Sequence, residues 1–295
     1  MTQRTLLLIA LFATIFGCKK LGVSAPDLTV TTNKTVYTAG DTVHFKFSGQ
    51  AGNIVFYSGE PGSNYANKDR DTADGIPQLQ FTSTMTVGTQ TNTLTLLATN
   101  DLAAIDSAHV VTANWTDITS RAKLSAGTAL ASGVIDLSDF KNSIKPLYLA
   151  FRYTGLKNTS AQRKWVISTF DVNNVLPDGS NGTISNIATA YWSAFNVKGP
   201  LVAWVIPATV TNITITGGAV ANSDENEDWI VTKPLILNKI VPDAGVSIQN
   251  IGGNALTGYD YIFSSPGKYK VTFVAFNNSR DDQKSVIKEL EIMVN

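Results

Sequence analysis

The chain contains 295 residues, and its 23 lysines and arginines balance its 23 aspartates and glutamates, so the formal net charge at pH 7 is zero. This balance provides no electrostatic attraction for nucleic acid and excludes a nucleic-acid-binding protein held by a basic surface. A hydrophobic fraction of 43% is that of a globular protein rather than a disordered one, and the length is sufficient for two domains.

The chain opens with a segment that has the pattern of a bacterial export signal. Arg4 precedes an apolar stretch over residues 6–13, and a small residue stands before Cys18, the single cysteine. This apolar stretch is too short to span a membrane and is typical of a secretory signal. We predict that residues 1–17 are removed, that acyl chains on Cys18 anchor the protein to a membrane, and that residues 18–26 form a tether. The alternative is an ordinary signal peptide with a chance cysteine.

After the tether, the chain consists of short segments of strand character. Apolar and polar residues alternate most clearly in residues 43–47, 147–153, 269–275 and 290–294. A period of two is that of a strand with one buried face. The apolar runs at 201–206 and 235–237 predict buried central strands, while only 138–143 and 278–284 allow a helical turn or two. The sequence therefore predicts an all-β protein of sandwich type.

Between these strands, several segments rich in Gly, Asn and Asp predict loops. They are residues 61–75, 173–186, 217–228 and 252–258.

Three segments resemble PKD domains, which are immunoglobulin-like sandwiches. Residues 265–277, SPGKYKVTFVAFN, have a Pro-Gly turn that leads into an alternating strand ending in Asn, as do the late strands of PKD domains. Residues 38–45, TAGDTVHF, and residues 54–62, IVFYSGEPG, resemble the early strands. About two hundred residues separate the two halves, whereas a sandwich of this type needs only about 100 in all.

This separation predicts an inserted domain. We expect residues 27–70 and 229–295 to form one PKD-like sandwich, with residues 71–228 inserted at an exposed loop. The competing architecture is two consecutive sandwiches with a boundary near Ala113.

The predicted insert has a resemblance of its own. Residues 115–119 (WTDIT), 132–138 (SGVIDLS), 147–153 (LYLAFRY) and 165–167 (WVI) are similar to jelly-roll modules of Bacteroidota surface proteins, which have a galactose-binding-like fold. Over residues 27–295 the chain resembles a Bacteroidota lipoprotein family, the domain-of-unknown-function 5017 type. The resemblance implies a lipid-anchored, surface-exposed outer-membrane protein beside a starch-utilisation-type uptake system. Its implied partners are a polysaccharide or oligosaccharide and the outer-membrane transporter complex.

Motifs for catalysis are absent from the sequence. The two histidines, His44 and His109, belong to no metalloprotease motif, and the chain has no nucleophile elbow, dinucleotide-binding loop or Walker loop. We therefore predict a protein that is not an enzyme. The alternative is a glycosidase-type carboxylate pair drawn from Glu60, Asp117, Asp136, Asp171 and Asp228.

One segment has part of a calcium-loop pattern. In residues 68–75 the carboxylates of Asp69, Asp71 and Asp74 alternate with other residues and a glycine follows. Ala73 stands where a ligand is needed and no glutamate follows at the required distance, so the pattern is incomplete. The sequence predicts no cofactor and leaves a structural calcium ion open.

Sugar binding by a β-sandwich requires aromatic rings that stack on sugar faces, with polar groups beside them for the hydroxyls. We expect Trp165, Trp204 and Trp229 to be packing residues, because each lies in or beside an apolar run. Tyr191 and Trp192 place aromatic rings on both faces of a short segment, and core packing is the alternative for Trp192.

A second candidate is Tyr65, in the loop after Glu60. We predict Tyr191, Trp192, Tyr65 and Glu60 as ligand-binding residues, with binding located in the inserted domain. The predicted function is a non-catalytic glycan-binding accessory lipoprotein. The alternative is a structural or adhesion scaffold that binds another envelope protein.

Overall fold

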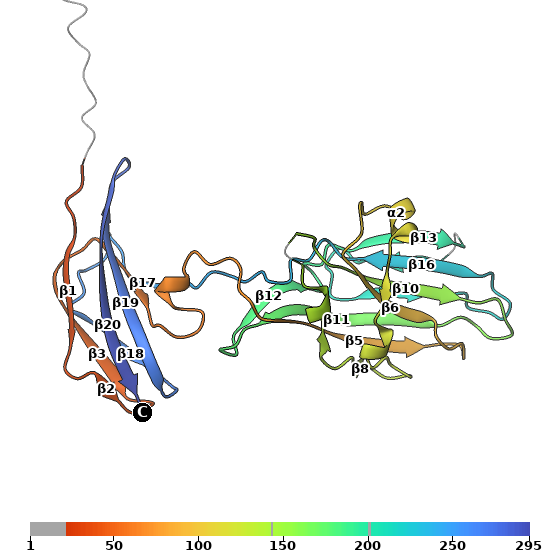
Figure 1. The fold of residues 1–295 in the computed structure, drawn as a ribbon, viewed down its shortest axis with the longest axis horizontal. Coiled ribbons are helices and arrows are strands. Elements are labelled where there is room, and N and C mark those ends of the chain that lie inside the picture. Colours follow the sequence, from red (N-terminus) through yellow and green to blue (C-terminus); the bar gives the residue numbers. More distant parts are fainter. Residues whose placement is uncertain (1–21, 143, 200–201) are drawn as a thin grey trace, which may run out of the picture. The chain divides into compact units, whose positions relative to one another are not determined.

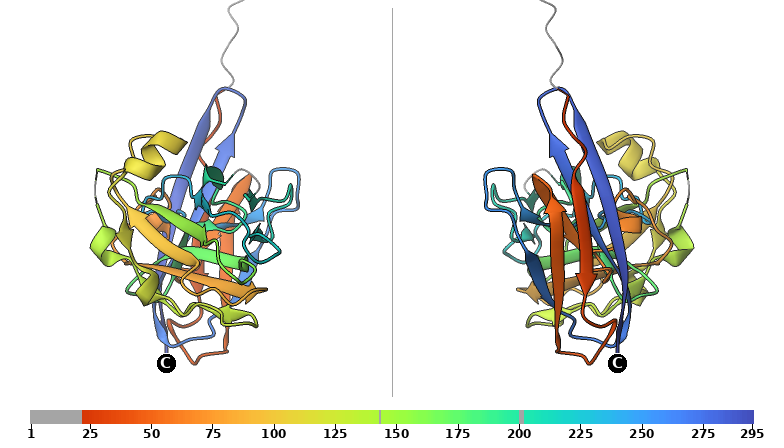
Figure 2. Two further views of the ribbon diagram at one scale, coloured as in Figure 1. Left: turned by 90° about the vertical axis from the view of Figure 1, so that its right-hand side faces the viewer. Right: turned by 90° about the vertical axis from the view of Figure 1, so that its left-hand side faces the viewer.

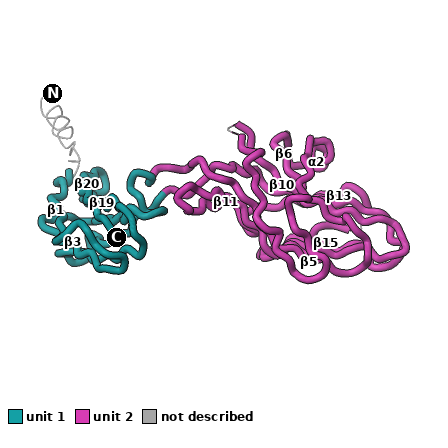
Figure 3. The backbone as a smooth tube through the Cα atoms, turned by 60° about the horizontal axis from the view of Figure 1, so that its bottom comes forward, with its two compact units in different colours: residues 1–68, 243–295 teal, residues 69–242 magenta. Residues whose placement is uncertain are grey.

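The computed structural model describes residues 22–142, 144–199 and 202–295 (Figure 1). The predicted signal segment and Cys18 lie outside these residues. The described chain is an all-β protein, which confirms the predicted fold class. It divides into two compact units, Met1–Lys68 with Asp243–Asn295 as unit 1 and Asp69–Pro242 as unit 2 (Figure 3). Among the described residues, no helix is long and apolar enough to cross a membrane.

In its described part, unit 1 contains two sheets, in which all strand pairs but one are antiparallel. The first sheet has the order β1 (Asp27–Thr32), β3 (Thr42–Gln50) and β18 (Gly258–Ile262). The second has the order β17 (Val246–Gln249), β4 (Asn53–Tyr57), β19 (Gly267–Asn278), β20 (Gln283–Val294) and β2 (Val36–Tyr37). β2 and β20 form the parallel pair. A 3₁₀ turn, η1 (Tyr65–Asn67), follows β4.

The core of unit 1 joins segments that are far apart in the sequence. Phe56 on β4 lies opposite Phe273 on β19 in the antiparallel register. The ring centroid of Phe45, on the other sheet, is 5.1 Å from that of Phe273. The alternation predicted for β3, β19 and β20 is confirmed, and β19 and β20 form a long hairpin (blue in Figure 2).

One glycine is required where β4 ends. Gly59 has a φ of +83°, and a Cβ atom at this position would lie 2.7 Å from the carbonyl oxygen of Lys270. Any other residue would combine backbone strain with a collision against β19. This explains the glycine in the segment that resembles the early PKD strands.

Unit 2 contains a five-stranded and a seven-stranded sheet in its described part. The five-stranded sheet has the order β13 (Ser193–Lys198), β16 (Asn226–Val231), β10 (Tyr148–Gly155), β6 (Leu94–Thr99) and β7 (Thr116–Asp117). The seven-stranded sheet has the order β14 (Trp204–Val205), β15 (Ile213–Thr216), β11 (Lys164–Val175), β5 (Ile76–Thr86) and β8 (Leu130–Ala131), with β12 (Asn181–Asn186) on β11 and β9 (Ile135–Asp136) on β5. The short helices are α2 (Ser107–Thr112), η2 (Thr119–Arg121) and η3 (Ser138–Phe140).

The main core of unit 2 lies between its two sheets. Phe151 on β10 meets Phe81 on β5 edge to face, with ring centroids 5.2 Å apart. A smaller cluster lies on the opposite, outer face of the five-stranded sheet, where Val110 of α2 packs with Leu97 and Trp229. The five-stranded sheet therefore has a core face and a second face that α2 helps to cover.

The second boundary of unit 2 differs from the sequence-based expectation. Residues 229–242 were expected in the PKD-like half, but they lie in unit 2. The reason is β16, which occupies an interior position of the five-stranded sheet and pairs with β10 and β13 on its two sides. All five tryptophans consequently lie in unit 2.

Two predicted central strands are wrong. In the described part of the run at 201–206, which is residues 202–206, the structure has only the two-residue strand β14, at the edge of its sheet. Pro207 follows where a longer strand would need an N–H donor. Residues 235–237, preceded by Pro234, form a single bridge between Leu235 and Leu147.

Three other local expectations also differ from the structure. The expected loop at 173–186 is a hairpin of β11 and β12. The expected helical turn at 278–284 is the tight connection between β19 and β20, where the N–H of Ser279 donates to the carbonyl of Asp282 at 2.8 Å. The sequence reading also missed α2, whose first turn is capped by the carboxylate of Asp106.

Candidate functional site

A hollow of about 440 Å³ lies on the outer face of the five-stranded sheet of unit 2. We call it the tryptophan hollow. It is lined by Leu97, Val111, Ala113, Asn114, Trp115, Asp117, Arg152, Val197, Glu227 and Trp229.

Strand register brings the central residues of the tryptophan hollow together. Arg152 on β10 lies directly opposite Trp229 on β16, and on its other side it lies opposite Thr95 on β6. Glu227 precedes Trp229 by two positions, so both side chains project from the same face of β16. The alternation that buries Phe151 and Tyr153 in the core therefore directs Arg152 to the outer face.

Two tryptophans form the apolar part of the hollow. The ring centroids of Trp115 and Trp229 are 5.6 Å apart with an interplanar angle of 49°. Trp229 is only 5% exposed and forms the floor, whereas Trp115 is partly exposed. Trp115 donates its Nε1–H to the carbonyl of Val110 at 2.8 Å, and this bond fixes the ring relative to α2. Trp115 is thus a held, accessible aromatic ring.

Polar groups surround this ring. The Nε1–H of Trp229 donates to Glu227 Oε1 at 2.7 Å, and the N–H of Thr119 donates to Asp117 Oδ1 at 2.8 Å. The guanidinium carbon of Arg152 lies 5.5 Å from the ring centroid of Trp229, a cation–π arrangement. The buried Nε of Arg152 has no hydrogen-bond partner among the described residues, which marks a place where water or a ligand group is expected.

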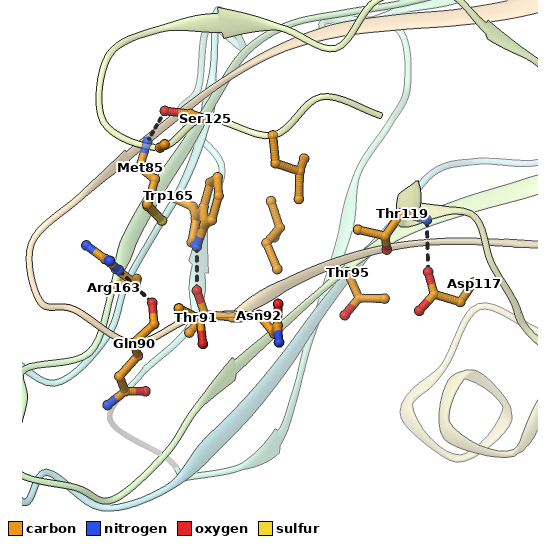
Figure 4. A pocket seen from close by; sticks show the side chains of 14 residues that line it. Met85, Gln90, Thr91, Asn92, Thr95, Asp117, Thr119, Ser125, Arg163 and Trp165 are labelled. Carbon is orange, nitrogen blue, oxygen red and sulfur yellow. Dashed lines mark hydrogen bonds between the residues drawn. The ribbon is translucent and has the colours of Figure 1, made fainter. Parts of the chain in front are cut away.

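A second hollow of about 370 Å³ shares Asp117 with the first. We call it the threonine hollow. Figure 4 shows Thr95, Asp117 and Thr119 at one end of it and Arg163 and Trp165 at the other.

The far end of the threonine hollow is held by hydrogen bonds. Trp165 donates its Nε1–H to Thr93 Oγ1 at 2.8 Å, and Arg163 donates its Nε–H to the carbonyl of Gln90 at 2.7 Å. Arg163 also donates from Nη1 to the carbonyls of Val87 and Gly88. Arg163 therefore organises the backbone of this loop. The cavity is lined by threonine side chains and Asn92 and also by apolar side chains, which are Met85, Leu94, Leu124, Ala126 and Trp165.

Trp192, one of the predicted ligand-binding residues, is a core residue. It is 8% exposed, its Nε1–H donates to the carbonyl of Ile187 at 2.9 Å, and its ring centroid lies 4.8 Å from that of Phe170. The stacking role predicted for it is corrected accordingly, because neither face of the ring is open to a sugar. Its neighbour Tyr191 is 70% exposed, has a φ of +46° and lies outside both hollows. Lys233 Nζ lies 4.8 Å from the Tyr191 ring centroid.

Glu60 and Tyr65 belong to unit 1, and both have partners there. The hydroxyl of Tyr261 donates to Glu60 Oε2 at 2.5 Å. Burial, followed by this hydrogen bond, raises the pKa of Tyr261. The Tyr65 ring meets that of Tyr57 edge to face at 5.2 Å. The predicted site residues are therefore divided between the two units and do not assemble within one of them.

The calcium candidates do not form a cluster. Asp74 pairs with Lys141, and the backbone carbonyl of Asp71 accepts a hydrogen bond from the N–H of Ile240 at 2.9 Å. Asp69 is exposed. Within the part of the chain that the structure describes, no group of three or more His, Cys, Asp or Glu residues could hold a metal ion.

A model of the family described as "Domain of unknown function (DUF5017)" matches residues 17–192, more than half of the chain. The chain belongs to this family. The DUF5017 match includes Trp115, Asp117 and Arg152 and ends before Glu227 and Trp229. No curated protein matches the chain.

The sequence reading missed the main residues of the tryptophan hollow in this DUF5017 protein. One signal was available, because Arg152 stands between Phe151 and Tyr153 in an alternating strand, so it had to lie on the face opposite two core residues. The placement of Trp115 depends on α2 and β7, which have no comparable pattern.

Proposed function

We propose that this protein is a non-catalytic glycan-binding lipoprotein of the cell envelope, accessory to an outer-membrane polysaccharide uptake system. The observation that carries the proposal is the tryptophan hollow, in which the partly exposed ring of Trp115 lies among Arg152, Asp117 and Glu227.

The chemistry of these residues suits a sugar. A pyranose ring has an apolar face that packs on an aromatic ring, and its hydroxyls need donors and acceptors at the rim. Arg152 provides donors, and the carboxylates of Asp117 and Glu227 provide acceptors beyond the bonds they already make. We assign these carboxylates a binding role rather than a catalytic one.

The envelope part of the proposal rests on Cys18, which lies outside the described residues. In the proposal, the acylated cysteine holds the protein on the surface of the outer membrane of a Bacteroidota cell, beside the transporter complex. Replacing Cys18 with Ser should move the protein from the detergent phase to the aqueous phase in detergent partitioning. A Cys18→Ser protein that stays in the detergent phase at unchanged mass would contradict the anchor.

Affinity electrophoresis tests the binding part directly. We expect the protein to be retarded in at least one of four gels, which contain amylopectin, arabinoxylan, galactomannan or yeast mannan. Trp115→Ala should weaken that binding by about 2 kcal/mol, roughly 30-fold, because a central aromatic anchor is lost. Tyr191→Ala is the matched control, since it removes an exposed ring outside both hollows. If Tyr191→Ala abolishes retardation and Trp115→Ala does not, the binding surface lies around Tyr191 instead.

The alternative function is a scaffold that binds another envelope protein. Three buried tryptophans favour the scaffold, because their rings pack in the core and leave fewer aromatic groups to bind a glycan. They are Trp165, Trp192 and Trp204. Absence of retardation by every polysaccharide, together with chemical cross-linking to an envelope protein, would support the scaffold and contradict glycan binding.

A further inference from the structure

We infer that the tryptophan hollow and the threonine hollow form one track for a neutral oligosaccharide chain, so that the protein binds a stretch of several sugars. This inference rests on the proposed glycan-binding function and specifies the ligand of that same site.

The two hollows are continuous. Asp117 lines both of them, so they adjoin at this residue. Thr95 of the threonine hollow lies directly opposite Arg152 of the tryptophan hollow in the β6–β10 register. Paired residues of neighbouring strands have side chains about 5 Å apart on the same face. The junction between the hollows is therefore formed by Asp117, Thr95 and Arg152.

The size of the hollows also suits a chain of several sugars. The two hollows have volumes of about 440 and about 370 Å³. Each is within the range of roughly 300–1,000 Å³ that is ordinary for a small-molecule site. A single sugar occupying one of them leaves the other empty, whereas a chain crossing Asp117 fills both.

The lining beyond the junction is mixed in character. Figure 4 shows the side chains of Thr91, Asn92 and Thr95, short uncharged groups that can donate and accept hydrogen bonds as sugar hydroxyls do. The Thr119 hydroxyl already accepts from the N–H of Leu96 at 2.9 Å. Apolar surface for the sugar rings comes from Met85, Leu94, Leu124 and Trp165. Asn92 has a φ of +55°, a conformation that asparagine tolerates better than most residues.

The charged residues of the track limit the kind of glycan that it can bind. Asp117 and Glu227 are the carboxylates of the track, and Arg152 and Arg163 are its cations. The guanidinium of Arg163 donates to three backbone carbonyls of the neighbouring loop, so it offers less to a ligand. Asp117 stands where any chain must cross, and it repels an anionic sugar at close range. These groups favour a neutral glycan over an acidic one.

Thr95 provides a variant that separates the two hollows. Its side chain is half-buried on the outer face of β6, and tyrosine is favourable in strands. Thr95→Tyr should obstruct the junction and leave the tryptophan hollow open. Thr95→Val is the matched control, because it keeps the shape of the side chain and removes only the hydroxyl.

The experiment uses the full-length protein, solubilised in detergent, in gels with the four neutral polysaccharides above and with polygalacturonate and alginate. Calorimetry then compares a disaccharide and a hexasaccharide prepared from the neutral polysaccharide that gives retardation. We expect the hexasaccharide to bind the unmodified protein at least ten-fold more tightly than the disaccharide. Thr95→Val loses one hydroxyl of the track, and we expect it to keep a preference of at least several-fold for the hexasaccharide. We expect Thr95→Tyr to bind both oligosaccharides with similar affinity.

Each result decides the inference. Equal affinity of the unmodified protein for both oligosaccharides would overturn the two-hollow track, whether or not Thr95→Tyr folds. A folded Thr95→Tyr protein that keeps the preference for the hexasaccharide would overturn it too, and the proposed function would stand in both cases. Retardation by the acidic polysaccharides alone would overturn the charge argument. Absence of retardation in every gel would overturn the proposed function and the inference with it.

Discussion

The two faces of the five-stranded sheet in unit 2 come from the same strands but have different roles. On the inner face, Phe151 and Ile230 are fully buried against the seven-stranded sheet. On the outer face, the adjacent residues Arg152 and Trp229 lie in the tryptophan hollow. The difference shows that alternation assigns each residue to a face, while the covering elements decide what that face does. Among the described residues, a whole sheet covers the inner face, whereas α2 and short loops cover the outer one.

The largest effect is expected on the inner face. Phe151→Ala should lower the free energy of unfolding by about 3–5 kcal/mol, because it removes a ring packed against Phe81 and leaves a cavity. Urea unfolding of the chain measures this loss. Arg152→Met, one position along the strand, should change stability by less than about 1 kcal/mol because its packing stem is kept. Similar losses for the two variants would mean that the two faces are not distinct.

The strands of this protein were predictable where apolar and polar residues alternate regularly in the sequence. The strands at 43–47, 147–153 and 269–275 were found because one face of each is buried along most of its length. Short edge strands such as β7 and β14 have two residues each and carry no period that can be detected. Register and edge position depend on the partner strands, which no local pattern encodes.

The candidate site was less predictable. Tyr191 and Trp192 were selected because they are adjacent aromatic residues. Adjacent residues direct one ring into the core and the other toward solvent only where the backbone is an extended strand. Here Tyr191 has a positive φ just before β13, and Trp192 turns into the core. The tryptophan hollow instead unites Trp115 and Trp229, which are more than a hundred residues apart in sequence.

On the outer face, Arg152 should matter for ligand and not for folding. Arg152→Met should weaken binding to the retarding polysaccharide by about 1.5–3 kcal/mol, roughly 12- to 150-fold, because charge-assisted hydrogen bonds are lost. The affinity of Arg152→Lys should lie between those of the unmodified protein and Arg152→Met, because lysine keeps the positive charge without the planar guanidinium. Affinity electrophoresis measures both variants beside the unmodified protein. Unchanged retardation of Arg152→Met would remove the arginine from the site.

A buried carboxyl group at one end of the inner face makes the stability of the fold depend on pH. Asp228 is fully buried and accepts a hydrogen bond from Asn196 Nδ2 at 2.9 Å, and its Oδ2 has no hydrogen-bond partner in the described chain. Burial raises the pKa of Asp228 to about 7. In the unfolded chain the pKa of an aspartate is about 3.9, so the folded state holds this proton more tightly. The stabilisation is complete below about pH 4 and is lost as the pH rises through 7.

Asp228→Asn should therefore remove a pH dependence rather than a fixed amount of stability. Between pH 5 and pH 8, the unmodified protein should lose on the order of 2 kcal/mol of unfolding free energy that the variant does not lose. Urea unfolding at the two pH values measures the difference. Asp171→Asn, at an exposed position of β11 in the same unit, is the control. Equal pH slopes in the unmodified protein and in Asp228→Asn would show that Asp228 stays ionised in the folded chain.

The smallest effect is expected at α2, the element that partly covers the outer face. The carboxylate of Asp106 caps this helix by accepting from the backbone N–H of His109 at 2.9 Å, and this bond lowers the pKa of Asp106. The cap is therefore present at neutral pH and is lost as the pH falls below the ordinary range of an aspartate. Asp106→Ala should make the amides of α2 exchange with solvent hydrogen several-fold faster, whereas Asp106→Asn should keep much of the protection because asparagine also caps helices. Because α2 supplies the carbonyl of Val110 that holds Trp115, the alanine variant should also weaken glycan retardation slightly. Faster exchange in α2 with no change in retardation would mean that the ring of Trp115 is held by Trp229 and the sheet, and that the helix contributes to the cover but not to the site.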